Sequence, residues 1–355
     1  MARIELSQLA HSYRPNPKAD DDYQLKRMDF VWEDGGAYAL LGPSGCGKST
    51  LLNIISGLLT PSEGRVLFDG RDVSTLNASQ RNIAQVFQFP VVYDTMTVAD
   101  NLAFPLRNRG VSEAEVRARV AEVGEMLELT PMLHRRAARL TADQKQKISL
   151  GRGLVRSDVA AILFDEPLTV IDPHLKWLLR RKLKQVHERY RRTLVYVTHD
   201  QNEALTFAQK VVVMLDGRVV QLGTPQELFE RPEHRFVGYF IGSPGMNFLR
   251  CSRDGDRIRI AGSDIELALD APPGEIELGI RPEFVELHAA ATGETLPARI
   301  TKVDDLGNFK LVTARLAGHE LKVKVADGRE VPAETAHLGF PPRWTRLYAD
   351  GRLVE

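Results

Sequence analysis

Short apolar runs alternate with segments of helix length over about the first 240 residues. Apolar runs of five or six residues, bounded by polar or turn residues, predict buried strands at 37–41, 83–87, 160–164, 193–197 and 210–215. Helices are predicted at 49–59, 111–129, 144–155 and 172–190. Asp216 and Gly217 suit a two-residue turn with positive φ, so a hairpin is expected over 215–223. This alternation is typical of an α/β domain.

The pattern changes beyond about residue 243. Helical periods stop near Ser243, and short strands follow, separated by turn pairs such as Asp254-Gly255 and Asp327-Gly328. We therefore expect an α/β domain over 1–240 and a second domain, a small all-β barrel, over 241–355.

Composition narrows the class of protein. A chain of 355 residues exceeds the size at which one core usually stops growing, which supports two domains. The 47 basic residues balance 47 acidic ones, so no electrostatic footprint for nucleic acid is present, and we expect no nucleic-acid partner. The two cysteines, Cys46 and Cys251, are too few for a disulfide framework or a zinc site and suit a reducing compartment. No signal peptide and no apolar run of about 18 residues is visible, so another chain would have to carry this one to a membrane.

The segment GPSGCGKST matches the pattern G-x-x-x-x-G-K-[ST] and lies between a predicted strand and a predicted helix. Its glycines let the backbone turn, and its amide groups would point at phosphate oxygens near a positive helix end. Lys48 would reach the β and γ phosphates of ATP, and the Ser49 hydroxyl would bind Mg²⁺. The alternative is a glycine-rich turn without a ligand. The expected nucleotide-binding residues are Gly42, Pro43, Ser44, Gly45, Cys46, Gly47, Lys48, Ser49 and Thr50.

Two further polar groups follow buried strands. In ILFDEP, a carboxylate pair at a strand end is costly unless it meets a cation. Asp165 would hold the Mg²⁺ shell, and Glu166 would polarise the attacking water. In VYVTHD, His199 would face the γ-phosphate. Taken singly, the acidic pair is open to interpretation as a strand-end cap and the histidine as a structural residue.

Together these motifs resemble the ATP-binding subunit of an ABC transporter. GPSGCGKST resembles the Walker A loop, VFQFP the Q-loop, ILFDEP the Walker B strand, PLTVID the D-loop and VTHD the H-loop, in the family's order. The resemblance implies a RecA-like core, an antiparallel β subdomain and a helical subdomain at about 90–157. It places Gln88 beside Mg²⁺, Asp172 in the D-loop and Tyr13 on adenine, with Tyr23 as a weaker candidate for the adenine contact. Glu166, His199 and Lys48 would be the catalytic residues.

The resemblance extends past residue 240. FIGSPGMNFL and GIRPEFVEL are similar to the linker and the OB/TOBE-like barrel of the carbohydrate and polyol (maltose-type) importer ATPases. This implies a peripheral subunit at the cytoplasmic face of the inner membrane, which powers uptake of a sugar or a polyol, with glycerol as the narrowest choice. The barrel would make regulatory or dimer contacts, and direct binding of sugar is the alternative. Membrane permeases would be direct partners and a solute-binding protein an indirect one.

In this family a coupling helix of the permease enters a groove of the ATPase. The resemblance places the groove at 89–93, where Phe89, Val91, Val92 and Tyr93 would form its apolar floor. Ordinary core packing of these side chains is the alternative.

The signature segment departs from the family. LTADQ at 140–144 stands where LSGGQ would contact the γ-phosphate of ATP bound to a partner ATPase. Thr141 and Gln144 keep the capping-box pattern, so the helix should begin at the same place. Ala142 adds a methyl group and Asp143 a negative charge, worth about 4 kcal/mol of repulsion at about 4 Å from a phosphate charge. We therefore expect pairing with a second ATPase that has an intact signature. The alternative is that Asp143 turns away as an extra helix cap.

Two other functions stay open at this point. One is a soluble, non-transport ABC ATPase acting on DNA or ribosomes, which the single cassette, the neutral charge and the importer-like tail disfavour. The other is a mainly regulatory subunit with low turnover, which the intact Glu166 and His199 disfavour. Basic clusters at 178–184 and 188–192 are interpreted as solvated faces of one helix and its end.

Overall fold

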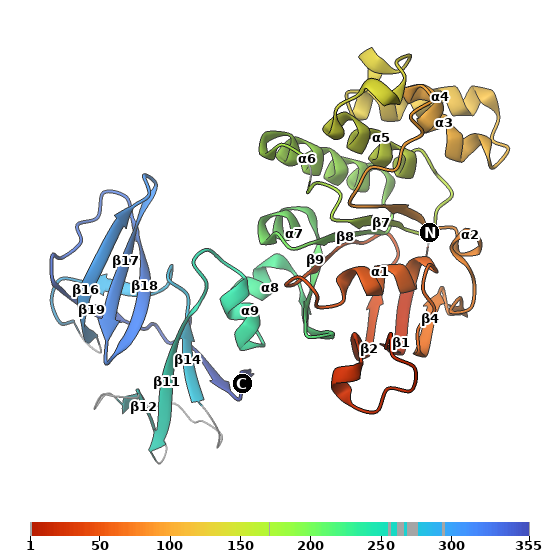
Figure 1. Cartoon of the computed structure of the whole chain (residues 1–355). Helices are drawn as coiled ribbons and strands as arrows, with labels where there is room; N and C mark the ends of the chain where they lie inside the picture. Colours follow the sequence, from red (N-terminus) through yellow and green to blue (C-terminus); the bar gives the residue numbers. More distant parts are fainter. Residues whose placement is uncertain are drawn as a thin grey trace. The chain divides into compact units, whose positions relative to one another are not determined.

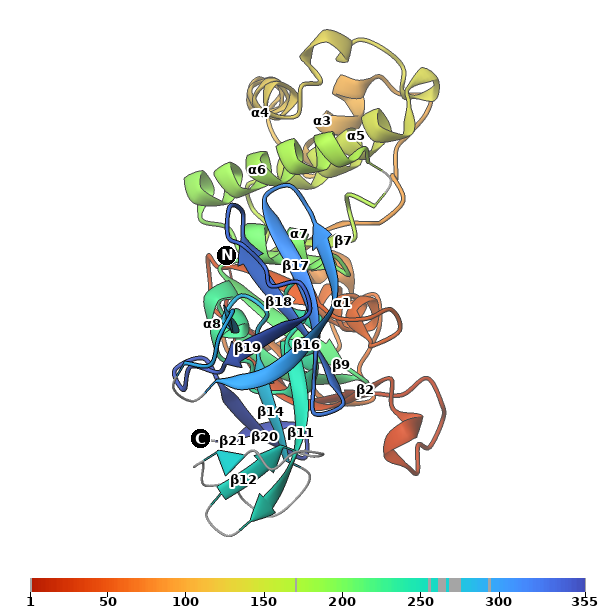
Figure 2. The same cartoon turned by 90° about the vertical axis from the view of Figure 1, so that its left-hand side faces the viewer.

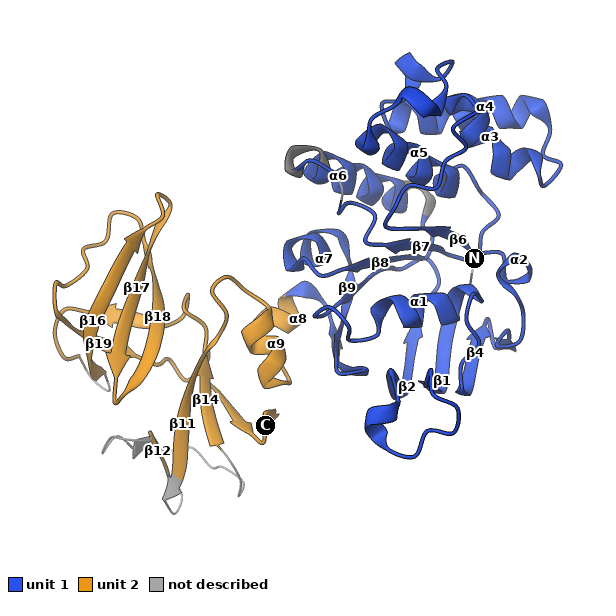
Figure 3. Cartoon of the chain, in the orientation of Figure 1, with its two compact units in different colours: residues 1–225 blue, residues 226–355 orange. Residues whose placement is uncertain are grey.

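The chain forms two compact units, Met1–Pro225 and Gln226–Glu355 (Figures 1 and 3). The computed structural model describes residues 2–169, 171–254, 257–260, 266–267, 276–292 and 295–354. No helix among these residues is both long and apolar enough to cross a membrane.

The first unit contains a six-stranded sheet with the order β10-β9-β3-β8-β7-β6. All its strand pairs are parallel except β9 with β10. Buried apolar residues fill its central strands, as expected for a sheet covered on both faces. The five predicted strands and the hairpin are confirmed, and both turn residues, Asp216 and Gly217, have positive φ. The strands are β3 (Ala37–Leu41), β6 (Ala84–Val86), β7 (Ile162–Asp165), β8 (Leu194–Thr198), β9 (Lys210–Leu215) and β10 (Arg218–Gly223).

A four-stranded antiparallel sheet with the order β2-β1-β4-β5 completes the strands of this unit. Side chains of both sheets and of α1 (Lys48–Ser56) share one hydrophobic core, which includes Trp32, Leu51 and Leu163. The core therefore fixes the start of α1 relative to the strand ends. The strands are β1 (Ile4–His11), β2 (Leu25–Trp32), β4 (Glu63–Phe68) and β5 (Arg71–Asp72).

Helices α3, α4 and α5 pack on one another at one end of the first unit (Figure 2). The predicted helices are confirmed as α1, α4, α5 and α6, whereas α3 was not predicted because Pro105 interrupts its pattern. The α-helices after α1 are α2 (Ala78–Arg81), α3 (Val98–Arg107), α4 (Glu113–Met126), α5 (Ala142–Leu154), α6 (Pro173–Tyr190) and α7 (Gln201–Phe207). The 3-10 helices are η1 (Asp20–Asp22), η2 (Thr130–Met132) and η3 (Ala137–Arg139).

The second unit is built mainly of two antiparallel sheets around one core, which confirms the all-β prediction beyond residue 243. The first sheet has the order β13-β12-β11-β14-β20-β21 and the second β15-β19-β16-β17-β18. Gly328 has the positive φ expected for a turn, whereas Gly255 lies outside the described residues. The strands are β11 (Asn247–Asp254), β12 (Arg257–Ile260), β13 (Glu266–Leu267), β14 (Ile276–Ile280), β15 (Glu286–His288), β16 (Leu296–Asp305), β17 (Phe309–Leu316), β18 (His319–Ala326), β19 (Thr335–Gly339), β20 (Arg346–Ala349) and β21 (Arg352–Val354).

Two helices precede these strands in the chain, α8 (Pro225–Glu230) and α9 (Arg235–Phe240). Arg281, which follows β14 and is 1% exposed, holds both of them. Its guanidinium lies 4.1 Å from the ring centre of Phe229. Burial lowers the pKa of Arg281 to about 10. The expected boundary at 240 thus falls inside the second unit. The carbonyl groups that accept hydrogen bonds from Arg281 are those of Leu228, Phe229, Gly238 and Ile241.

Candidate functional site

The loop from β3 to α1 requires glycine at several positions. A Cβ on Gly42 would lie 2.3 Å from the Met214 carbonyl oxygen, and one on Gly47 would lie 2.5 Å from Leu25 Cδ2. Gly45 has a φ of +83° with open space around it, so its backbone faces outward in a conformation that glycine adopts without strain. The loop therefore packs closely against the rest of the protein at Gly42 and Gly47 and is open at Gly45.

Lys48, the first residue of α1, is buried within this loop. Its Nζ donates hydrogen bonds to the carbonyl oxygens of Gly42 and Pro43, both at 2.8 Å. Because main-chain carbonyls are neutral, they solvate the ammonium group without neutralising its charge, and a phosphate group would be a stronger partner. Cys46 Sγ lies 3.9 Å from the same nitrogen, and burial raises the pKa of this thiol. Ser44, Gly45 and Ser49 are exposed at the loop surface.

Asp165, the last residue of β7, lies against the start of α1. Ser49 Oγ donates a hydrogen bond to Asp165 Oδ1 at 3.1 Å, although the two residues are far apart in sequence. Burial raises the pKa of Asp165; the Ser49 hydrogen bond opposes this, the charge of Glu166 adds to it, and Lys48 opposes it. A desolvated carboxylate beside a hydroxyl is a pair of oxygen ligands of the kind that Mg²⁺ prefers, so these residues fit the predicted metal.

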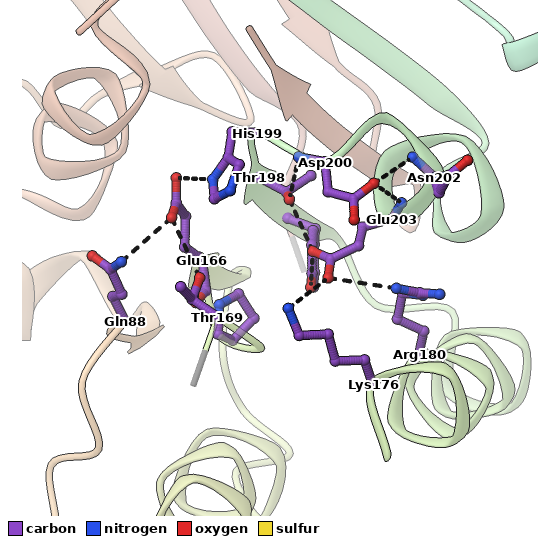
Figure 4. A network of polar contacts seen from close by, with 12 residues as sticks. Gln88, Glu166, Thr169, Lys176, Arg180, Thr198, His199, Asp200, Asn202 and Glu203 are labelled. Atoms are coloured by element: carbon purple, nitrogen blue, oxygen red, sulfur yellow. Dashed lines mark hydrogen bonds and ion pairs between the residues drawn. The ribbon is translucent and has the colours of Figure 1, made fainter. Parts of the chain in front are cut away.

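Glu166, which follows β7, contacts side chains that follow β6 and β8 (Figure 4). It has a positive φ of 45°, a rare conformation for this residue type. Its Oε1 lies 3.0 Å from Nδ1 of His199, which follows β8, and Gln88 Nε2 donates to its Oε2 at 3.4 Å. Thr169 Oγ1 donates to the Glu166 carbonyl at 3.1 Å and approaches its Oε2 at 3.4 Å. The structure thus brings Glu166, His199 and Gln88 together. Gln88, which was predicted beside Mg²⁺, places its amide on Glu166.

Tyr13, the predicted adenine contact, lies just beyond β1 and is 63% exposed. Its hydroxyl is 3.1 Å from Thr50 Oγ1 on α1, and its ring meets the His11 ring edge to face at 4.8 Å. Tyr23 instead donates its hydroxyl to Glu63. Of the two tyrosines, Tyr13 is the one that the structure places against the phosphate-loop helix.

The signature segment begins α5, with Thr141 as its N-cap residue. Gln144 Oε1 accepts the Thr141 N–H at 3.2 Å, which confirms the predicted capping box and helix start. The Thr141 hydroxyl donates to the carboxylate of Asp143, and Ala142 is exposed. The negative charge therefore lies within the first turn of this helix.

The D-loop residue Asp172 is exposed before the start of α6. Its carbonyl oxygen accepts the Lys176 N–H at 2.9 Å. Val170 of the same PLTVID segment lies outside the described residues.

Gln146 was missed by the reasoning from sequence. It lies on α5, is almost fully buried, and donates from Nε2 to the carbonyls of Phe87 at 3.3 Å and Pro167 at 2.7 Å. It therefore links the helix that begins with the signature to the neighbours of both Gln88 and Glu166. A polar residue on the buried face of a predicted helix was the only sign of it in the sequence.

The segment predicted to receive a permease lies largely at the surface. Phe89 is 69% exposed, Val91 and Tyr93 are exposed, and Val92 is half-buried. Asn101, fully buried on α3, fixes this segment because its Oδ1 accepts the Tyr93 N–H at 2.8 Å. A cavity of about 220 Å³ adjoins the segment. It is lined by Ile83, Ala84, Gln85, Phe87, Val91, Pro105, Ser149, Arg152, Gly153 and Arg156, so helices α3 and α5 contribute to a surface that the sequence placed on the segment alone.

Comparisons with known proteins agree with this geometry. The ABC transporter family matches residues 25–169, the MalK OB fold domain residues 242–285 and the TOBE domain residues 278–347. The sn-glycerol-3-phosphate import ATP-binding protein UgpC of Pectobacterium atrosepticum is 38% identical and covers 92% of this chain and 91% of its own. The protein of the same name from Burkholderia pseudomallei is 39% identical and covers 98% of each chain.

Two solved structures share the fold of the first unit. The ATP-binding cassette MJ0796, bound to ADP and Pi as a dimer, is 28% identical with a TM-score of 0.56, covering 62% of this chain and 98% of its own. The cbiO1 protein from Clostridium perfringens, part of an ABC transporter complex, is 26% identical with a TM-score of 0.57, covering 64% and 90%. The chain therefore belongs to the ATP-hydrolysing subunits of the ABC transporter family, with OB-fold and TOBE domains of the MalK type at its C-terminal end.

Proposed function

We propose that this chain hydrolyses ATP at its own Walker motifs to power import of a small sugar or polyol, and that a polyol phosphate such as sn-glycerol 3-phosphate is the first solute to test. The observation that carries the proposal is the convergence of Lys48, the Ser49–Asp165 pair and the Glu166–His199 pair around the start of α1 and the ends of β7 and β8. The names of the relatives support the choice of solute.

Each group has a chemical role that follows from its position. Lys48 would exchange its two carbonyl partners for β and γ phosphate oxygens. Ser49, Asp165 and Gln88 would hold Mg²⁺. When bound, Mg²⁺ supplies positive charge that offsets the charge developing on the phosphates. Glu166 would accept the proton of the attacking water. Because Nδ1 of His199 contacts Glu166, the other ring nitrogen, Nε2, would be the one that contacts a γ-phosphate oxygen.

The catalytic assignment is tested by Glu166→Gln in the assembled transporter. We expect loss of a general base to lower both phosphate release and uptake of labelled sn-glycerol 3-phosphate by about 10²–10⁴-fold, with ATP still bound. Glu188→Gln, an exposed position on α6, is the matched control and should keep full activity. Uptake and hydrolysis at wild-type rates in Glu166→Gln would contradict the assignment. Hydrolysis lost with uptake retained would instead support a mainly regulatory subunit.

We further propose that the chain works at the cytoplasmic face of the membrane through a permease helix held at the 89–93 segment. The exposed Phe89 and Val91 and the adjoining cavity give that helix an apolar surface. Phe89→Asp should release the chain from permease-containing membranes without affecting ATP binding. Unchanged membrane association in this variant would show that the permease binds elsewhere.

The assembly that we propose is an asymmetric pair with a second ATPase whose signature is intact. Asp143 supports this, because two copies of the present chain would place a carboxylate at both signature positions of the pair. Native mass spectrometry of the transporter purified from its own membranes counts the distinct ATPase subunits directly. An active transporter that contains only two copies of this chain would exclude the pair.

A further inference from the structure

A buried carboxylate outside the proposed catalytic groups lies next to the His199 turn. Glu203, in the first turn of α7, is 4% exposed. Its Oε2 accepts hydrogen bonds from the hydroxyl groups of Tyr196 at 3.0 Å and Thr198 at 2.8 Å. Figure 4 shows the contact with Thr198. Its Oε1 faces two cations on α6, with Lys176 Nζ at 3.8 Å and Arg180 Nη1 at 3.5 Å. One carboxylate therefore divides its two oxygens between strand β8 and helix α6.

Side chains of the same group of residues form hydrogen bonds with the backbone that follows His199. Thr198 Oγ1 accepts the Asp200 N–H at 3.0 Å while it donates to Glu203. Asp200 Oδ1 in turn accepts the N–H groups of Asn202 at 2.8 Å and Glu203 at 3.4 Å. His199 is the single residue between Thr198 and Asp200, so its main chain has little freedom while its ring extends toward Glu166.

The other end of the network reaches the D-loop. Lys176 lies in the first turn of α6, and its N–H donates to the carbonyl of Asp172 at 2.9 Å. Lys176 and Arg180 are spaced by four residues, so they lie on one face of α6, and both point at Glu203. A displacement of the D-loop end of α6 would therefore pull on the carboxylate that holds the His199 turn.

Burial makes this arrangement more than a surface ion pair. A carboxylate removed from water is unfavourable unless it is hydrogen-bonded and paired, and Glu203 has two hydroxyl donors and two cations. Burial also raises the pKa of Tyr196 well above its usual range, so its hydroxyl keeps its proton and remains a donor. Lys176 and Arg180 are partly exposed, so without the carboxylate they can turn toward water.

We propose that Glu203 is a positioning residue that ties the D-loop end of α6 to the His199 turn and so sets His199 against Glu166. This inference rests on the proposed roles of His199 and Glu166. Glu203 touches no reacting atom; it acts through Thr198 and the backbone of the turn. Coupling through such a chain of contacts is demonstrated only when two members of it are shown to interact energetically.

The discriminating variant is Glu203→Gln, measured in the assembled transporter by single-turnover hydrolysis and ATP affinity. The amide keeps the size of the side chain and an oxygen that accepts from Thr198, but it loses the charge that attracts α6. We expect the hydrolysis rate to fall at least tenfold, with the Kd for ATP unchanged within about twofold. Glu188→Gln, an exposed position on α6 outside this network, is the matched control.

Two combined variants separate positioning from general support of the fold. If Glu203 acts through His199, adding Glu203→Gln to His199→Gln should slow the residual hydrolysis less than twofold. In the cycle with Lys176→Met, the double variant should be no slower than Glu203→Gln alone. Lys176→Met also covers the case in which Glu203→Gln does not fold, because Lys176 is partly exposed and its loss alone should slow hydrolysis with unchanged ATP affinity.

The outcomes keep this inference apart from the proposed function. If Glu166→Gln and His199→Gln strongly reduce hydrolysis while Glu203→Gln and Lys176→Met behave as wild type, the positioning role is wrong and the catalytic assignment stands. Full independence of the Glu203 and His199 effects would also overturn the positioning role. If Glu166→Gln and His199→Gln retain full hydrolysis, the catalytic assignment fails.

Discussion

Neutralising Asp143 should increase the tendency of this chain to pair with itself in the presence of ATP. The carboxylate lies in the first turn of α5, where it accepts a hydrogen bond from Thr141. A helix N-terminus attracts phosphate through its free N–H groups, and a carboxylate at the same place repels it. Asp143→Asn removes the charge and keeps both the size and an oxygen that accepts from Thr141. Asp143→Gly also removes the side chain, and Ala142→Gly removes only the neighbouring methyl group.

The expected magnitude follows from comparing two opposing effects of the charge. At an effective dielectric constant of about 20, a carboxylate and a phosphate charge repel by about 4 kcal/mol at about 4 Å and about 2 kcal/mol at about 8 Å. The same carboxylate stabilises its own helix by about 0.3–1 kcal/mol through the helix dipole. Repulsion of the nucleotide is the larger effect, so Asp143→Asn should strengthen ATP-dependent pairing by roughly 30-fold to 1,000-fold for each of the two nucleotide sites in the pair. It should also slightly lower the stability of the chain.

Sedimentation of the purified chain over a range of ATP concentrations measures this pairing. Every variant would carry Glu166→Gln so that ATP persists, and Asp21→Asn, at an almost fully exposed carboxylate, is the charge control. Ala142→Gly alone should have a smaller effect than Asp143→Asn. The reasoning is refuted if Asp143→Asn and Asp143→Gly both pair as weakly as the parent chain, because the signature charge would then not oppose nucleotide binding.

Two further predictions concern stability. Arg281→Met leaves four buried or half-buried carbonyls without their cationic donor. The free energy of unfolding of the second unit should therefore fall by about 3 kcal/mol or more, with ATP binding retained. An unchanged melting temperature would contradict this. The second prediction concerns Arg107. Its guanidinium lowers the pKa of Glu113, and the pKa of Asp100 is lowered first by the Thr97 hydroxyl and then by Arg107. Carboxylates with lowered pKa values stabilise the folded chain above about pH 4 and lose this contribution as the pH falls through their folded pKa values. The free energy of unfolding of Arg107→Gln should therefore fall less steeply with decreasing pH than that of wild type. Equal slopes in the two proteins would exclude the effect.

Local chemistry made much of the nucleotide site predictable. Gly42 and Gly47 occupy loop positions where a Cβ would collide with Met214 or Leu25. The central strands are apolar runs because both faces of their sheet are covered. Such constraints act on adjacent residues and therefore leave a pattern in the sequence. The capping box of Thr141 and Gln144 is equally local, which explains why the start of α5 was predicted correctly.

Contacts between distant segments were not predictable in the same way. Gln146 and Glu203 are polar residues on helices, and their roles depend on carbonyl, hydroxyl and cationic partners from other elements. The contact made by the Asp143 side chain was not predictable either, because the same residue pattern fits an extra helix cap and a carboxylate directed at the nucleotide. Helix α3 was missed for a different reason, since the energy of packing on α4 and α5 outweighs the local cost of Pro105.

The four carbonyls around Arg281 also determine where related chains can exchange their C-terminal halves. A crossover at residue 240 would join foreign α8 and α9 to this chain's β14, so the buried guanidinium and three of its four carbonyl acceptors would come from different sequences. A crossover at 225 would transfer the arginine and its acceptors together. Recombination between relatives, natural or in the laboratory, should therefore yield folded hybrids more often when the breakpoint precedes α8.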